Sequence, residues 1–150
     1  MTRILSIAAL TILTLAIGLI SCARPEWISD ENEILKALVS HELLAILGVI
    51  VTITLASAAS LHLELNRLED SFSESFEEAR FATKAYAYLL ITLFAGALVL
   101  VTLKPLLATD SHWQAAFNGA AIWIIALNIL AWLDLTSAVF AIPPDRKLKK

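Results

Sequence analysis

Charged residues are missing from four long stretches of this chain. No Asp, Glu, Lys or Arg occurs in residues 4–23, 43–63, 85–103 and 111–133. Each stretch has about the ~20 apolar residues that an α-helix needs to cross a ~30 Å hydrocarbon layer. The stretches also lack the alternation of barrel strands. Because lipid cannot hydrogen-bond an open backbone, the sequence predicts one all-α domain, an integral membrane protein with four transmembrane helices in a small bundle.

Other absences exclude classes of function. The single cysteine, Cys22, excludes an intrachain disulfide, a thiolate zinc cluster and a four-cysteine iron–sulfur site. With only four glycines, the chain has no phosphate-binding loop, dinucleotide fingerprint or G-x-S-x-G elbow. The net charge of −3 gives no basic surface for nucleic acid. We therefore expect no enzyme, no cofactor, no metal site and no nucleic-acid partner.

Two histidine motifs resemble catalytic signatures without completing them. His41 and Glu42 begin like the zinc-protease motif H-E-x-x-H, but Ala45 stands where the second zinc ligand belongs. His62 begins an H-x-E sequence, but the cysteines of a zinc deaminase are absent. A different use of histidine stays open, because His41 and His112 are both expected near the outer surface and could ligate a haem between helices.

Lys and Arg predict the orientation, since positive charge is retained on the cytoplasmic side. With the N-terminus inside, eight basic residues lie on the cytoplasmic side and three outside. We therefore expect an inner or plasma membrane protein with both termini in the cytoplasm. An alternative concerns the first span, because the residues before Cys22 also suit a lipoprotein signal. Cleavage there would leave three spans and a lipid-modified Cys22.

The connections between spans are expected to be helical. A helix capped by Ser29 or Asp30 could run unbroken over residues 32–69, which contain no Pro. Capping residues then predict a turn near residues 70–75 and a short cytoplasmic helical hairpin between spans two and three. The hairpin carries acidic residues and two phenylalanines expected to protrude. Its charges are consistent with a solvated rim held by Glu-to-Arg helix pairs, and the alternative is a docking surface for a basic cytoplasmic partner or a cation. The expected contact residues are Glu69, Asp70, Phe72, Glu74, Phe76, Glu77 and Glu78.

Small residues form a stripe along the second predicted span. At 100° per residue, one narrow face carries Ala45, Gly48, Thr52, Ala56 and Ala59. Lipid provides no hydrophobic drive for helices to associate, so small side chains that let backbones approach are the expected seam. We expect this face to pack against another helix of the chain or of a second copy, or to line a pore.

Polar residues in the last span and at the end of the second would lie at or near membrane depth. They are His62, Asn118, Asn128 and Asp134. An amide or carboxylate in lipid is costly unless it is paired. Helical projection turns Asp134 away from Asn128, so these groups should not form one continuous polar path. Asp134 is expected near the inner interface, paired with His62 or with a basic C-terminal side chain.

Three functions fit these features. The favoured one is a non-enzymatic assembly, accessory or regulatory subunit that associates with itself or with other membrane subunits. It accounts for the stripe, for the acidic hairpin and for the absence of catalytic motifs. The alternative is a channel- or pore-forming effector, holin-like or toxic, although a selective pore more usually shows charged rings. A membrane redox subunit with haem between His41 and His112 is the third.

Overall fold

The computed structural model describes residues 2–72 and 76–140, and side chains for 6–69 and 76–137. The chain is 92% helical, and the described residues contain no strand, which confirms the prediction of an all-α fold. Four helices are long and apolar enough to cross a membrane. They are α1 (Thr2–Ala23), α3 (Leu43–Phe72), α4 (Glu77–Leu107) and α5 (Ser111–Phe140).

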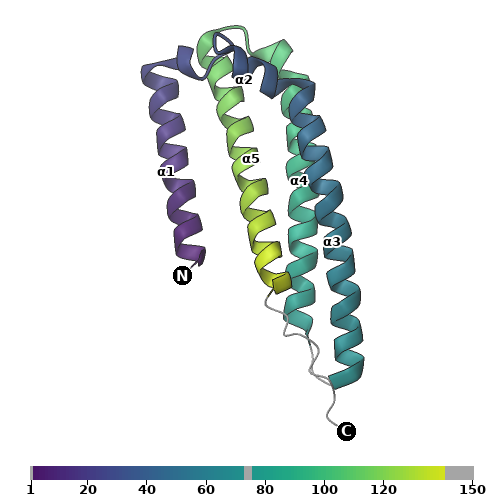
Figure 1. Cartoon of the computed structure of the whole chain (residues 1–150). Coiled ribbons are helices and arrows are strands. Elements are labelled where there is room, and N and C mark those ends of the chain that lie inside the picture. The colour runs from purple at the N-terminus through teal and green to yellow at the C-terminus, as the bar shows by residue number, and fades with distance from the viewer. Residues whose placement is uncertain (1, 73–75, 141–150) are drawn as a thin grey trace.

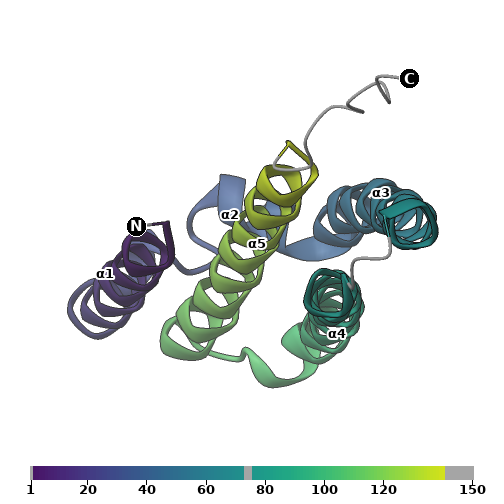
Figure 2. The same cartoon turned by 90° about the horizontal axis from the view of Figure 1, so that it is seen from below.

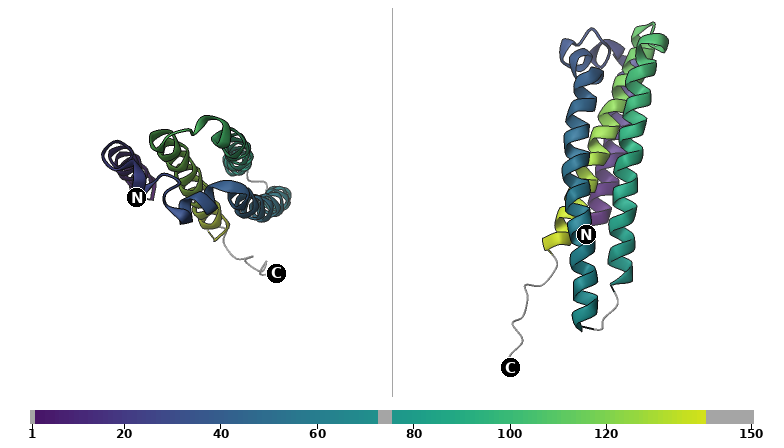
Figure 3. Two further views of the ribbon diagram at one scale, coloured as in Figure 1. Left: turned by 90° about the horizontal axis from the view of Figure 1, so that it is seen from above. Right: turned by 90° about the vertical axis from the view of Figure 1, so that its right-hand side faces the viewer.

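The four long helices are arranged around α5. Viewed along the bundle, α1 stands on one side of α5, while α3 and α4 stand together on the other (Figure 2). The N-terminus and the end of α5 point the same way (Figure 1). At that end, α3 and α4 continue beyond both α1 and α5 (Figures 1 and 3). We call this the hairpin end, and the opposite end the connector end.

A connector of short helices joins α1 to α3. It consists of η1 (Pro25–Trp27), α2 (Glu33–Ala37) and η2 (Leu38–Glu42). The connector crosses over the end of the bundle, as the view from above shows (Figure 3, left). Asn32 caps α2, since its side chain accepts hydrogen bonds from the backbone N–H groups of the next turn. The prediction that Ser29 or Asp30 caps this helix is therefore wrong. Ser29 is buried, and the Asp30 side chain contacts residues of α4 and α5 instead.

The predicted continuous helix over residues 32–69 is also wrong, because the backbone is broken at Val39 and Ser40. Val39 has φ −87° and ψ 57°, and Ser40 has φ −139° and ψ −153°. The Ser40 hydroxyl donates to the Ala37 carbonyl and accepts from Glu42 N–H. These local bonds compete with the helical pattern, as serine side chains commonly do. The break leaves the Val39 carbonyl without its helical partner, so another donor can reach it.

Large residues, rather than small ones, form the core side of α3. Its fully or nearly buried positions follow steps of three and four residues, and are Leu43, Leu47, Val51, Thr54, Ala58, Leu61 and Leu65. The same clusters contain Leu90 and Ala97 of α4 and Ala121 and Leu135 of α5. This spacing is that of a helix with one face in a core. Leucines of α3 therefore pack against alanines of α4 and α5 in the interior of the bundle.

Candidate functional site

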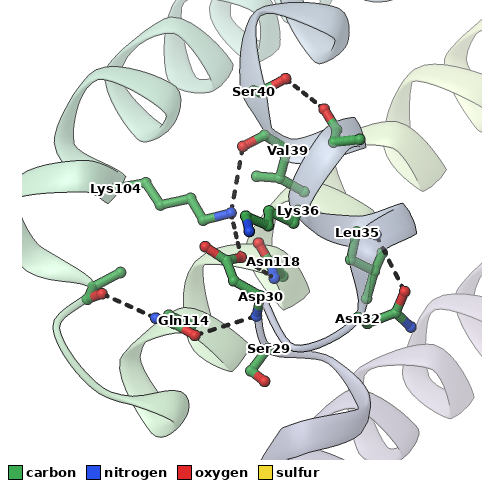
Figure 4. Close-up of polar contacts among 12 residues, drawn as sticks. Ser29, Asp30, Asn32, Leu35, Lys36, Val39, Ser40, Lys104, Gln114 and Asn118 are labelled. Atoms are coloured by element: carbon green, nitrogen blue, oxygen red, sulfur yellow. Dashed lines mark hydrogen bonds and ion pairs between the residues drawn. The ribbon is translucent and has the colours of Figure 1, made fainter.

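A buried ion pair lies at the connector end. Lys104 Nζ is 2.7 Å from Asp30 Oδ1, and the Lys104 side chain is only 8% exposed. The same ammonium donates to the Val39 carbonyl at 3.4 Å, the group freed by the helix break. Figure 4 shows Lys104 reaching from α4 to both acceptors. A buried charge needs such partners, because its desolvation is costly.

Two amide side chains of α5 complete this group. Asn118 Nδ2 donates to the Ile28 carbonyl at 2.7 Å and to Asp30 Oδ1 at 3.1 Å. Gln114 Oε1 accepts from Asp30 N–H at 3.2 Å (Figure 4). We call Asp30, Lys104, Gln114 and Asn118 the connector cluster. Because each charge already has partners of opposite polarity, the connector cluster fastens the connector to α4 and α5 and leaves no evident nucleophile or base.

The sequence did not indicate Lys104 or Gln114 as site residues, and it indicated Asp30 only as a helix cap. One signal was present: Lys104 follows directly after the charge-free residues 85–103, where a charge at the end of a span needs a partner. Asn118 was selected for the same reason. The structure gives it partners in the connector, 88 and 90 residues away in the chain, which local patterns do not reveal.

Asn128 lies deeper in the bundle and apart from the connector cluster. It is 1% exposed, and its Nδ2 donates to the Ile124 carbonyl of its own helix at 2.9 Å. Its Oδ1 is buried without a hydrogen-bond partner. None of its recorded hydrogen bonds leads to Asn118 or Asp134, in keeping with the expectation of separate polar groups.

Asp134 has a different partner from the two that were expected. Its Oδ2 accepts a hydrogen bond from Tyr86 Oη of α4 at 3.0 Å. His62 is half-buried, and its Nδ1 has no hydrogen-bond partner. The basic C-terminal side chains, the other expected partners, lie outside the described residues. Tyr86 lies 48 residues from Asp134 in the chain, so no local sequence pattern predicts this pairing.

The two candidate haem ligands have different neighbours. His112 Nδ1 lies 3.4 Å from the Ser21 carbonyl at the end of α1. His41 lines a pocket of about 300 Å³ that also contains Lys36, Lys104 and Pro105. A haem held between the two imidazoles stays a prediction. Among the described residues, no three His, Cys, Asp or Glu side chains group as metal ligands would.

The hairpin end is braced by Arg80. Its guanidinium lies 2.8 Å from Glu69 Oε2 and donates to Asn66 Oδ1 at 3.2 Å, which ties α4 to α3. Phe76 packs against the cluster that contains Leu61 and Leu65. The expectation that Phe76 protrudes is therefore wrong, because burying the ring stabilises the start of α4 more than exposing it to water.

Four of the seven expected contact residues have described side chains, and two of these four are exposed. Glu77 and Glu78 are exposed, Glu69 is used in the Arg80 ion pair, and Phe76 is packed inward. Glu74 and the side chains of Asp70 and Phe72 lie outside the described residues. Glu64 is also exposed on the α3 side, where its carboxylate lies 3.9 Å from the Arg67 guanidinium.

The small-residue stripe faces away from the core of the chain. Ala45, Thr52, Ala56 and Ala59 are exposed, and Gly48 is half-buried. A Cβ at Gly48 would meet Phe94 Cε2 of α4 at 3.7 Å, an ordinary contact. The intrachain seam therefore does not follow the stripe, because α3 turns its leucines inward instead. Packing of the stripe against a second copy stays a prediction.

The close approach within the chain occurs at Gly119 of α5. A Cβ there would lie 2.6 Å from Ile17 Cγ2 of α1, so a side chain at this position would force α1 away. Trp123 Nε1 donates to Thr14 Oγ1 at 2.9 Å along the same seam. Such a small residue at a helix crossing is what membrane bundles use to bring backbones together.

Comparison with known proteins finds no matching family model, no similar curated protein and no similar solved structure.

Proposed function

We propose that this protein is a non-enzymatic component of the inner or plasma membrane, whose four spans hold an acidic helical hairpin at the cytoplasmic surface for a basic partner. The observation that carries the proposal is the extension of α3 and α4 beyond the other helices at the hairpin end (Figure 1). A hairpin that serves only to reverse the chain has no need of this length. Lys and Arg numbers favour the cytoplasm for this end.

Contacts between its two helices support the hairpin as a contact surface. Arg80 joins the two helices through Glu69 and Asn66, and Phe76 anchors the start of α4 in the core. Prior ordering lowers the entropic cost of binding a partner. The described part of the hairpin would therefore need little further ordering when a partner binds.

The charge of the hairpin favours a basic partner. Glu77 and Glu78 are adjacent and exposed in the first turn of α4, and Glu64 is exposed on α3. Charges at the rim of an interface chiefly set the rate of association and its salt dependence. A partner with a lysine- or arginine-rich segment at the membrane surface would match this pattern.

A crosslinking experiment tests the proposal. A photoreactive residue at Ala79, which is exposed on the hairpin, should form an adduct with a partner in cells or membranes. In a chain with both Glu77→Gln and Glu78→Gln, the adduct should fall about fivefold, the size expected when exposed ion pairs worth up to about 1 kcal/mol are lost. High salt should likewise reduce the amount of adduct that the wild-type chain forms.

The matched control is the pair Glu31→Gln and Glu33→Gln, two exposed acids at the connector end. That variant should keep the full adduct. If the hairpin variant folds normally and keeps every adduct, the hairpin is not the contact surface. The search would then move to the polar groups of α5, namely Asn118, Asn128 and Asp134.

A further inference from the structure

A groove runs between α3 and α5 on the surface of the bundle, toward the hairpin end. Its volume is about 780 Å³. Its α3 wall includes Ile53, Ala56 and Glu64, and its α5 wall includes Trp132, Leu135 and Thr136. Leu135 is buried beneath it, while Glu64 and Trp132 are exposed. Thr54, Ser57 and Ser60 also line the α3 wall, where each hydroxyl donates to a carbonyl of α3. The groove is therefore mostly apolar, with a carboxylate at one end.

The length of the groove matches one leaflet of a membrane. Its α3 wall runs from Ile53 to Glu64, a rise of about 16 Å at ~1.5 Å per residue. Half of a ~30 Å hydrocarbon layer is about 15 Å. Ile53 is the middle residue of the charge-free stretch 43–63, and Glu64 is the first residue after it. The groove would thus extend from the bilayer centre to the head groups on one side.

Glu64 lines the mouth of the groove, and a basic residue of α3 lies just beyond it. Arg67 Nη1 lies 3.9 Å from Glu64 Oε2, one helical turn farther along α3. Trp132 stands across from them on α5, and tryptophan is enriched at the level of lipid head groups. A carboxylate next to a guanidinium complements a zwitterion, because the carboxylate accepts from an ammonium and the guanidinium donates to a phosphate.

From this match we infer that the groove binds a phospholipid with a primary ammonium in its head group. One acyl chain lies along the groove, the ammonium donates to Glu64, and the phosphate lies beside Arg67. A helix from a second copy fits less well, since it would be expected to follow α3 through both leaflets, whereas the groove ends at Ile53. The inference rests on the membrane insertion in the proposed function, but not on the partner of the hairpin.

Quenching of Trp132 fluorescence tests the inference in lipid vesicles. Trp27, Trp113 and Trp123 are replaced by Phe, which leaves Trp132 as the one tryptophan. Phosphatidylethanolamine, brominated near the head-group end of its chains, is compared with equally brominated phosphatidylcholine in a phosphatidylcholine background. The primary ammonium can donate hydrogen bonds and the choline group cannot. We expect phosphatidylethanolamine to associate about threefold to fivefold more strongly, the range of an exposed ion pair.

Two variants and two controls complete the test. Glu64→Gln should bring the ratio of the two lipids to about one, whereas Glu33→Gln, an exposed acid at the connector end, should leave it unchanged. Ala56→Leu fills the groove and should reduce quenching by both lipids. Ala59→Leu adds the same side chain to an exposed position of α3 outside the set of groove residues, and should not.

Three results would overturn the inference. Equal quenching of Trp132 by both lipids in the wild-type groove would mean that the groove contacts bilayer lipid without selecting a head group. Shielding of Trp132 from both lipids, with a dimer found by mass, would mean that a second copy covers the groove. Absence of quenching in a monomer would mean that α5 is not in the bilayer, which would contradict the proposed function as well.

Discussion

Among single residues, Lys104 and Asp30 decide how the connector is held. Lys104 joins α4 to Asp30 and to the Val39 carbonyl. The Asp30 carboxylate also accepts a hydrogen bond from Asn118, and the Asp30 backbone N–H donates one to Gln114. If one partner of a buried ion pair is removed, the other is left with a desolvated charge, which costs more than the pair contributed. The connector cluster should therefore respond strongly to a single substitution.

We expect Lys104→Met to lower the free energy of unfolding by roughly 3 kcal/mol, because it removes the cation that pairs with the partly buried Asp30 carboxylate. Adding Asp30→Asn should recover part of that loss, since the stranded charge is then gone. The control is Lys36→Met: Lys36 is 57% exposed and lies 3.8 Å from Glu33, so its loss should cost less than about 1 kcal/mol. Unfolding in mixed micelles measures all three. Equal losses for Lys36→Met and Lys104→Met would contradict the structural role of the buried pair.

At the scale of elements, composition predicts where the helices lie better than it predicts which face of a helix is buried or where a helix is broken. Charge-free residues were sufficient to indicate the four long helices, because helix length follows from the apolar run. The break at Ser40 depends on its hydroxyl and on a lysine 64 positions later in the chain, and a periodicity search detects neither. The core face of α3 was misassigned because small residues allow close packing but do not require it, and here leucines of α3 pack against the small residues Ala97 and Ala121 of the neighbouring helices instead.

The attachment of α1 gives a prediction at this scale. Gly119→Leu should push α1 away from α5, since even a Cβ would lie 2.6 Å from Ile17 Cγ2. The rest of the bundle should keep its packing, because α3, α4 and α5 contact one another independently of α1. Spin labels at the exposed residues Ile12 and Ile129, in a chain with Cys22→Ser, would report the separation.

The distance distribution between those labels should be narrow in the parent chain and broad or longer with Gly119→Leu. Gly96→Leu is the control, because nothing lies within 4 Å of a Cβ at Gly96. A narrow, unshifted distribution in the Gly119→Leu chain would show that this close approach does not position α1.

At the scale of the whole molecule, the two ends differ in character. The connector end is closed by a polar cluster that holds the segment before α2, at Ile28 and Asp30, and η2, at Val39, against α4 and α5 (Figures 3 and 4). The hairpin end extends farther and exposes carboxylates. The sequence indicated an acidic hairpin, but not its brace, because Arg80 acts through Asn66 and Glu69 of another helix. Closure at one end and exposure at the other agree with a protein that meets its partner on one side of a membrane.

The central claim, a four-pass protein with the hairpin and both termini in the cytoplasm, is tested most directly by cysteine accessibility. Single cysteines replace Trp27, Ser73, Asp110 or Lys147 in a chain that lacks Cys22, and intact cells are treated with a thiol reagent that does not cross membranes. We expect labelling at Trp27 and Asp110, and protection at Ser73 and Lys147 until the membrane is opened. Any other pattern at Ser73, Asp110 and Lys147 would contradict the topology and, with it, a cytoplasmic role for the hairpin.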